Sequence, residues 1–119
     1  KYSPNKSILK LAKKQKIKLT ITSKPSEEVN GAYFVMTYKW VSMNDKVNKV
    51  SKKKTLKPYQ INKKLMSIAN SAAIFMHCLP VGRGEEVTNE VIDGNQSVVW
   101  RQALNRVHAQ KSIIKWCID

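Results

Sequence analysis

The most informative pattern along the chain is a short apolar run over residues 73–76 that leads to a proline at position 80. An uninterrupted apolar run of this length is typical of a strand that is buried on both faces of a parallel sheet. Pro80 has no backbone N–H to donate and two glycines follow it closely, so the strand should end there and open into a loop. We therefore expect His77, Cys78 and Leu79 at the carboxyl end of a strand, which is where open α/β sheets bind ligands.

The remaining pattern predicts helices that alternate with strands. An apolar stripe with lysines opposite it predicts an amphipathic helix over residues 5–16. Apolar and polar residues then alternate over residues 18–23, which indicates a half-exposed edge strand, and residues 32–37 are predicted to form an inner parallel strand. Further elements are predicted as a helical turn from Ser26, a helix capped by Asn62, a short helix capped by Thr88, a brief strand over 97–100 and a last amphipathic helix over 103–118.

Residues 38–58 show no such periodicity, and lysines accumulate in the second half of that stretch. This pattern predicts a long loop, of a length that is uncommon in compact domains unless the loop is functional or disordered. The order of the predicted elements implies right-handed crossovers and an α/β fold with a parallel sheet.

The formal net charge of +14 is concentrated in the first half of the chain. Residues 1–64 hold 17 lysines against three acidic residues, whereas residues 65–119 hold five basic and five acidic residues. Such an asymmetry can mark a surface that binds nucleic acid or another polyanion. Every basic residue before Arg83 is a lysine, however, and phosphate clamps and base readers favour the planar fork of arginine. A solvated lysine-rich surface is the favoured interpretation, and a polyanion-binding module is kept as the alternative.

Composition predicts one domain with a modest core, because the chain has 119 residues of which 42% are hydrophobic. It contains no apolar stretch long enough to span a bilayer and no export leader, so we expect a soluble, cytoplasmic protein without a membrane partner. Cys78 and Cys117 are expected to be free thiols in a reducing compartment. His77 and Cys78 should point to opposite faces of their strand, and His108 and Cys117 lack zinc-ligand spacing, so neither a metal site nor a cofactor is expected.

Four segments, in the same order, closely resemble motifs of the ornithine carbamoyltransferase family. They are Trp40-Val41-Ser42-Met43, Lys57-Pro58-Tyr59-Gln60, the run from His77-Cys78-Leu79-Pro80 to Arg83-Gly84-Glu85-Glu86-Val87-Thr88, and Asn105-Arg106-Val107-His108-Ala109-Gln110-Lys111. The similarity extends from Tyr2 to Ile118 without a large gap and covers the carboxyl-terminal, ornithine-binding portion of the family.

This resemblance implies that residues 1–119 form part of the second, amino-acid-binding domain of a carbamoyltransferase. The family converts carbamoyl phosphate and ornithine to citrulline and phosphate, the type of reaction used in arginine biosynthesis or the urea cycle. It holds carbamoyl phosphate with an S-x-R-T motif on an amino-terminal domain, and none of the three arginines of this chain lies in such a motif. With the carbamoyl-phosphate domain absent, the chain is expected to be inactive alone.

The resemblance also implies roles for individual residues. Arg106 matches the family's arginine that reaches the carbamoyl group, although an arginine on a helix surface is the alternative interpretation. Cys78 and the backbone carbonyl of Leu79 match contacts to the amine and the carbamoyl group. We expect Cys78 to bind and orient rather than to act as a nucleophile, with inert packing as the alternative. The other residues expected to bind the amino-acid substrate are His77, Pro80, Tyr38, Ser42 and Met43.

The chain departs from the family next to Trp40. Where the family has an aspartate in T-D-x-W, this chain has Thr37-Tyr38-Lys39-Trp40, so a phenol replaces the carboxylate that should pair with the substrate's ammonium group. A charge-assisted hydrogen bond lost in this way costs roughly 1.5–3 kcal/mol. We therefore expect Tyr38 to weaken or change the binding of ornithine.

The family's substrate domain also opens with two strand–helix units that have no counterpart in this chain. In a doubly wound sheet of order 3-2-1-4-5 the missing strands would lie between residues 18–23 and 32–37. The expected fold is therefore an incomplete doubly wound, Rossmann-like parallel sheet flanked by helices. Bare strand edges invite pairing, so we expect a longer protein or a partner, with a homo-oligomer, a trimer in the family, as the implied assembly. A degenerate remnant without activity is a third interpretation.

Overall fold

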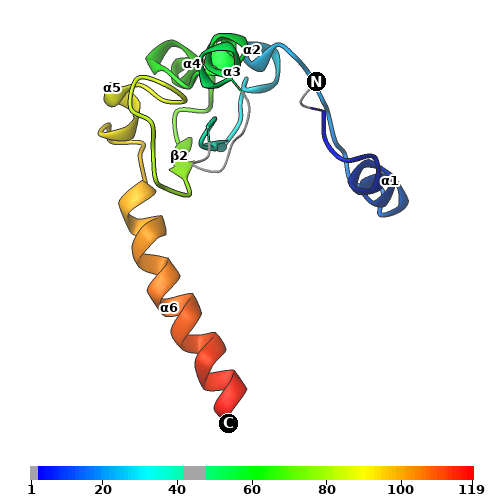
Figure 1. Ribbon diagram of the computed structural model, residues 1–119, viewed down its shortest axis with the longest axis vertical. Helices are drawn as coiled ribbons and strands as arrows, with labels where there is room; N and C mark the ends of the chain where they lie inside the picture. Colours follow the sequence, from blue (N-terminus) through cyan, green and yellow to red (C-terminus); the bar gives the residue numbers. More distant parts are fainter. Residues whose placement is uncertain (1–2, 42–47) are drawn as a thin grey trace.

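A computed structural model describes residues 3–41 and 48–119 of the chain, and its centre is a pair of parallel strands (Figure 1). Strand β1 (Phe34–Thr37) pairs with β2 (Ile74–His77) in a register that runs from Phe34 opposite Ile74 to Thr37 opposite His77. Within the described residues the sheet contains these two strands. The predicted α/β fold with parallel pairing is confirmed.

Helices surround this pair and also extend away from it. The helical elements are α1 (Lys6–Lys14), α2 (Pro25–Glu28), α3 (Lys49–Leu56), the 3-10 helix η1 (Lys57–Tyr59), α4 (Lys63–Ile68), α5 (Asn89–Ile92) and α6 (Val99–Ile118). In Figure 1, helices α2, α3 and α4 gather at one end of the sheet, while α6 projects from the opposite end as a single long rod. The carboxyl ends of the strands thus lie near the start of α6.

The hydrophobic core surrounds β2. Phe75 of this strand is a core residue and has no exposed area. The members of the core come from β1, α4, β2, α5, the first residue of α6 and the segments between these elements. They are Val29, Val35, Ile61, Met66, Ala73, Phe75, Val87, Val91, Ile92 and Val99. Burial of this apolar surface is the main favourable term in folding.

The predicted strand over residues 18–23 is not formed. Leu19 and Ile21 keep the alternating pattern of a strand, but their side chains are 53% and 55% exposed. The prediction is wrong because a strand needs a neighbouring ladder, and within the described residues no strand lies beside this segment. The missing neighbours also affect β1, which is an edge strand rather than an inner one, with Phe34 70% exposed and Met36 55% exposed.

The predicted loop over residues 38–58 is wrong in its second half, where α3 and η1 form. Asn48 begins α3, since its Oδ1 accepts the N–H groups of Val50 and Ser51 at 3.0 and 3.1 Å. No residue of α3 is buried, so its sequence shows no apolar periodicity. The predicted strand over residues 97–100 is also wrong, because a single residue, Ser97, bridges to Phe75 before α6 begins.

The last helix is confirmed, but its apolar residues are not covered within the described chain. Only Val99 of α6 is buried. The exposed apolar side chains of this helix are Trp100, Leu104, Val107, Ile113, Ile114, Trp116 and Ile118. Helix α1 is confirmed in the same way and has no buried residue. The packed part of the molecule therefore extends from α2 to the first turn of α6.

Removal of the cap of α4 tests this placement of the core. The side-chain Oδ1 of Asn62 accepts the Leu65 N–H at 2.9 Å, and α4 buries Met66. We expect Asn62→Ala to lower the free energy of unfolding by about 1 kcal/mol, the usual cost of a lost cap. Asn5→Ala is the matched control, because Asn5 caps α1 with an equal 2.9 Å bond to Ser7 N–H but α1 lies outside the core. Urea denaturation should show a smaller loss for Asn5→Ala, and equal losses would contradict the assignment.

Candidate functional site

The candidate site begins where β2 ends. His77 is the last residue of the strand and is buried, whereas Cys78 is exposed, so the two side chains lie on opposite faces as the strand period requires. Leu79 has a left-handed backbone with φ of 52°, and the Leu79–Pro80 peptide bond is cis. The chain therefore turns sharply at the edge where parallel sheets bind ligands.

Cys78 and Arg106 line the same cleft. This cleft has a volume of about 310 Å³ and is bordered by His77, Cys78, Gln102, Ala103 and Arg106. Arg106 is exposed on α6, and within the described residues its guanidinium has no hydrogen-bond or ion-pair partner. A free guanidinium beside an exposed thiol offers donors and a positive charge to a polar ligand at the end of the strand.

Gln102 joins the two sides of the cleft, and sequence reasoning missed it. Its Oε1 accepts the backbone N–H of His77 at 3.1 Å, which fixes α6 against the end of β2. Arg106 follows Gln102 by four residues, about one helical turn, and so lies on the same face of α6. This side-chain bond helps to hold Gln102 and Arg106 near the Cys78 peptide. The four-residue spacing from Gln102 to Arg106 is the one sequence feature that points to Gln102. A helical glutamine is not distinctive in a sequence unless its hydrogen-bond partner, here the His77 N–H, is known.

The side chain of His77 is held beneath the loop. Its Nδ1 accepts the N–H of Leu79 at 2.9 Å, and its Nε2 lies 3.4 Å from Oε1 of Glu86. Burial lowers the pKa of His77, and repulsion from Lys39 lowers it further, while Glu86 acts in the opposite direction. The net direction is downward, so the neutral imidazole is favoured, in agreement with an Nδ1 that accepts a hydrogen bond.

Glu86 is a second residue that sequence reasoning did not single out. Its side chain has no exposed area, and Oε1 accepts the backbone N–H of Gly82 in a very short contact. Oε2 of Glu86 and Nε2 of His77 are buried without a hydrogen bond in the structure. Burying a carboxylate beside an imidazole costs folding free energy when their polar atoms lack hydrogen bonds.

Comparisons with known proteins bear directly on this arrangement. The family model for the Asp/Orn-binding domain of aspartate/ornithine carbamoyltransferase matches residues 1–117. The chain belongs to the aspartate/ornithine carbamoyltransferase family. The ornithine carbamoyltransferase of Rhodopseudomonas palustris is 54% identical over 116 residues, which cover 98% of this chain and 37% of that protein.

Solved ornithine carbamoyltransferases have the same fold. The enzyme from Pyrococcus furiosus matches with a TM-score of 0.84 and 38% identity, over 95% of this chain and 37% of that chain. The anabolic enzyme from Campylobacter jejuni matches with a TM-score of 0.88 and 32% identity, over 97% and 39%. The Rossmann-like class expected from the sequence is confirmed, and this carbamoyltransferase-family chain spans a little over a third of the length of such relatives. None of these relatives supports the polyanion-binding alternative.

Of the other residues predicted from the sequence to bind substrate, Tyr38 and Pro80 lie within the described part of the chain. Tyr38 follows β1 and is 71% exposed, and Pro80 follows Leu79 in the loop. Ser42 and Met43 lie outside the described residues, so their predicted contacts are not described. Trp40 and Val41, the last described residues before them, are buried.

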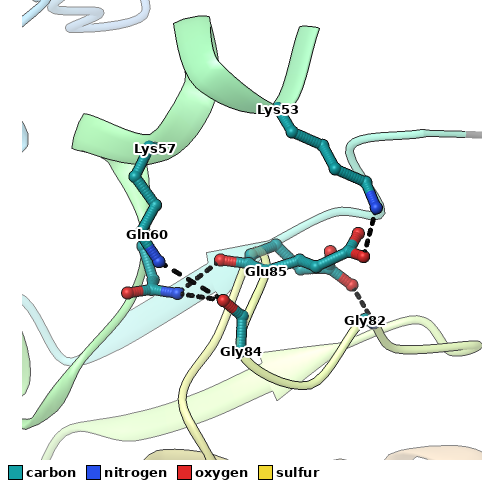
Figure 2. A network of polar contacts seen from close by, with 7 residues as sticks. Lys53, Lys57, Gln60, Gly82, Gly84 and Glu85 are labelled. Carbon is teal, nitrogen blue, oxygen red and sulfur yellow. Dashed lines mark hydrogen bonds and ion pairs between the residues drawn. The ribbon is translucent and has the colours of Figure 1, made fainter. Parts of the chain in front are cut away.

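A polar network connects α3 and η1 to the loop that follows Pro80 (Figure 2). Lys53 of α3 forms a 2.5 Å ion pair with Glu85, and Nζ of Lys57 donates to the Gly84 carbonyl at 3.3 Å. Nε2 of Gln60 donates to the carbonyls of Gly84 and Glu85 at 2.8 and 2.6 Å. The segment with the family's Y-Q motif therefore fixes the loop that follows the H-C-L-P motif.

Across residues 3–41 and 48–119, no group of three or more His, Cys, Asp or Glu side chains is arranged to hold a metal ion. In the same residues no helix combines the length and the apolarity that crossing a membrane would require.

The lowered pKa of His77 predicts a pH-dependent stability. Because the folded state disfavours the charged imidazole, the contribution of His77 is complete above the pKa of an unfolded histidine and decreases as pH falls through the lower folded-state pKa. We expect the urea midpoint to fall between about pH 7 and about pH 5, where histidine ordinarily titrates. The fall should be smaller in His77→Asn and unchanged in His108→Gln, whose histidine is exposed on α6. An equal fall in all three proteins would contradict the assignment.

Proposed function

We propose that this chain supplies the amino-acid-binding half of an ornithine carbamoyltransferase site. It would bind ornithine and present its side-chain amine to carbamoyl phosphate, with citrulline and phosphate as products. The observation that supports this most directly is that Cys78 and Arg106 line one cleft at the carboxyl end of β2. Family membership suggests the reaction, and the cleft offers an exposed thiol and a free guanidinium to its substrates.

The reaction joins the Nδ of ornithine to the carbonyl carbon of carbamoyl phosphate. The lone pair of the neutral amine forms the new C–N bond, the C–O bond to phosphate breaks, and the proton that the amine loses is taken up by the leaving phosphate. In our proposal the thiol of Cys78 and the carbonyl of Leu79 accept N–H groups of the amine, which aims its lone pair. The guanidinium of Arg106 donates to the carbamoyl oxygen, on which negative charge grows in the transition state.

Recognition of the amino acid is assigned to the residues around the cleft. In addition to Cys78 and Leu79, we propose that Pro80 shapes the loop. We also propose that Tyr38, the residue after β1, faces the substrate's ammonium group. Ser42 and Met43 complete the proposed set through the family's W-x-S-M motif. Lys39 is close enough to His77 to lower its pKa, so a second positive charge lies near this end of the sheet. An ornithine ammonium would meet repulsion there that a carboxylate at position 38 would offset.

Carbamoyl phosphate is assigned to a separate domain in this proposal. The 119 residues contain no S-x-R-T sequence, and the relatives are nearly three times as long as the matched region. We also propose a homo-oligomeric assembly, as the family resemblance implies. The open edge of β1 and the exposed apolar residues of α6 are surfaces that other protein segments would cover.

Substitution of Arg106 tests its proposed contact with the carbamoyl group. L-Citrulline contains that group and L-ornithine does not, so calorimetry with both amino acids separates the contact from general binding. We expect Arg106→Lys, which keeps the charge but loses the planar fork, to weaken citrulline binding by roughly ten- to a hundredfold and to change ornithine binding little. Arg101→Lys on the same helix is the control and should change neither. Equal losses for both ligands would contradict the proposed role.

Restoration of the family's carboxylate tests the proposed ammonium site. Tyr38→Asp should strengthen L-ornithine binding by roughly ten- to a hundredfold, because it restores a charge-assisted hydrogen bond. Tyr38→Asn is the matched control, with the same shape as aspartate but no charge, and should give little of this gain. Calorimetry at low salt measures both. If Tyr38→Asp binds no more tightly than the unmodified chain, position 38 does not face the ammonium group and the proposed pose is wrong.

A further inference from the structure

The buried pair of His77 and Glu86 is not used by the proposed reaction. The side chains of both residues have no exposed area, and each has a polar atom without a hydrogen bond. The bond from the Leu79 N–H to Nδ1 of His77 connects the pair to the cleft that His77 and Cys78 border. Such a pair is expensive to bury and suggests a specific task.

We propose that His77, held by Glu86 and Gln102, is a positioning residue that sets the Cys78–Leu79 backbone for the amino-acid substrate. This inference rests on the proposed function, because that function assigns the substrate to the Cys78 thiol and the Leu79 carbonyl. It adds three residues, none of which would touch the reacting atoms.

The first step of the argument is the tautomer of His77. Nδ1 accepts the Leu79 N–H at 2.9 Å, so it must be unprotonated, and the ring proton lies on Nε2. Nε2 faces Oε1 of Glu86 at 3.4 Å. A carboxylate in that place favours the proton on Nε2, and it therefore keeps Nδ1 available to Leu79.

The second step is the backbone that this bond holds. Leu79 has a φ of 52°, a left-handed conformation that is disfavoured for a side chain with a Cβ. The bond from its N–H to His77 helps to offset that preference. Because the peptide rotates as a unit, the conformation of Leu79 determines where the Cys78 and Leu79 carbonyls point.

The third step is the support of the pair itself. The Gly82 N–H donates to Oε1 of Glu86, and a Cβ at position 82 would lie 2.7 Å from Oε2 of Glu86. Gly82 therefore permits the close approach that places the carboxylate behind His77. From the other side, Gln102 accepts the His77 backbone N–H at 3.1 Å and ties this assembly to the helix of Arg106.

The experiment compares two polar replacements of His77 in the 119-residue chain. His77→Asn places an oxygen acceptor where Nδ1 was, whereas His77→Gln places its amide near the former Nε2 and leaves Leu79 N–H without an acceptor. We expect a strong intraresidue amide–Hα contact of Leu79 in nuclear magnetic resonance, the signature of positive φ, in the unmodified chain and His77→Asn. We expect its loss in His77→Gln, together with about tenfold weaker L-ornithine binding by calorimetry, the change that one hydrogen bond provides.

Each result bears on the proposal separately from the proposed function. Nitrogen chemical shifts of the unmodified chain report the His77 tautomer directly, and an Nδ1-protonated or doubly protonated ring at neutral pH would overturn the inference. So would a left-handed Leu79 that persists in His77→Gln. If Leu79 and the tautomer behave as expected but the unmodified chain does not bind L-ornithine, the positioning device stands and the proposed substrate is wrong. Gln102→Ala, which removes the acceptor of the His77 N–H, should weaken L-ornithine binding.

Discussion

The pairing of β2 on both of its edges is the constraint on which the rest of the structure depends. One edge pairs with β1, where the Ile74 N–H bonds to the Tyr33 carbonyl at 2.9 Å. On the other edge, the Phe75 N–H bonds to the Gln96 carbonyl at 2.8 Å and Val98 N–H bonds to Phe75 carbonyl at 3.0 Å. Phe75 and His77 are buried and Ile74 and Met76 are half-buried, so the backbone groups of β2 must be satisfied in this way, and residues 96–98 and the start of α6 lie against it.

This double pairing explains why the site lies where it does. The last N–H of β2 has no strand beside it, so a side chain, Gln102, supplies the acceptor. This hydrogen bond holds α6 at the end of the strand, where Arg106 lines the same cleft as Cys78. Where such pairing is missing, as beside residues 17–22 and the free edge of β1, the apolar side chains are exposed. The contrast indicates that the backbone ladder, rather than local propensity, determines which segments are ordered into the core.

The elements that sequence predicted well are those with a local cause. Asn5 and Asn62 cap their helices, the run before Pro80 forms β2, and the apolar stripe near the carboxyl end forms α6. The misses have non-local causes. Residues 18–23 have a strand pattern but no partner strand among the described residues, and α3 has no apolar stripe but contacts another loop through the ion pair of Lys53 with Glu85. Roles for Cys78 and Arg106 could be assigned from the family motifs. Gln102 lies outside those motifs and Glu86 lies in one without an assigned role, because the contacts of both residues are seen only in the folded structure.

The neighbouring residues Glu85 and Glu86 show how one short motif serves two parts of the site. Glu85 faces outward and pairs with Lys53, while the Gln60 amide binds the carbonyls of Gly84 and Glu85, so this face of the loop is held by the segment after β1 (Figure 2). Glu86 faces inward, toward Gly82 and His77. If the loop shifted by one residue relative to His77, Glu85 and Glu86 would exchange places, and the contacts of both carboxylates would be lost. The spacing from His77 to Glu86 therefore places one carboxylate against the buried imidazole and the other against Lys53.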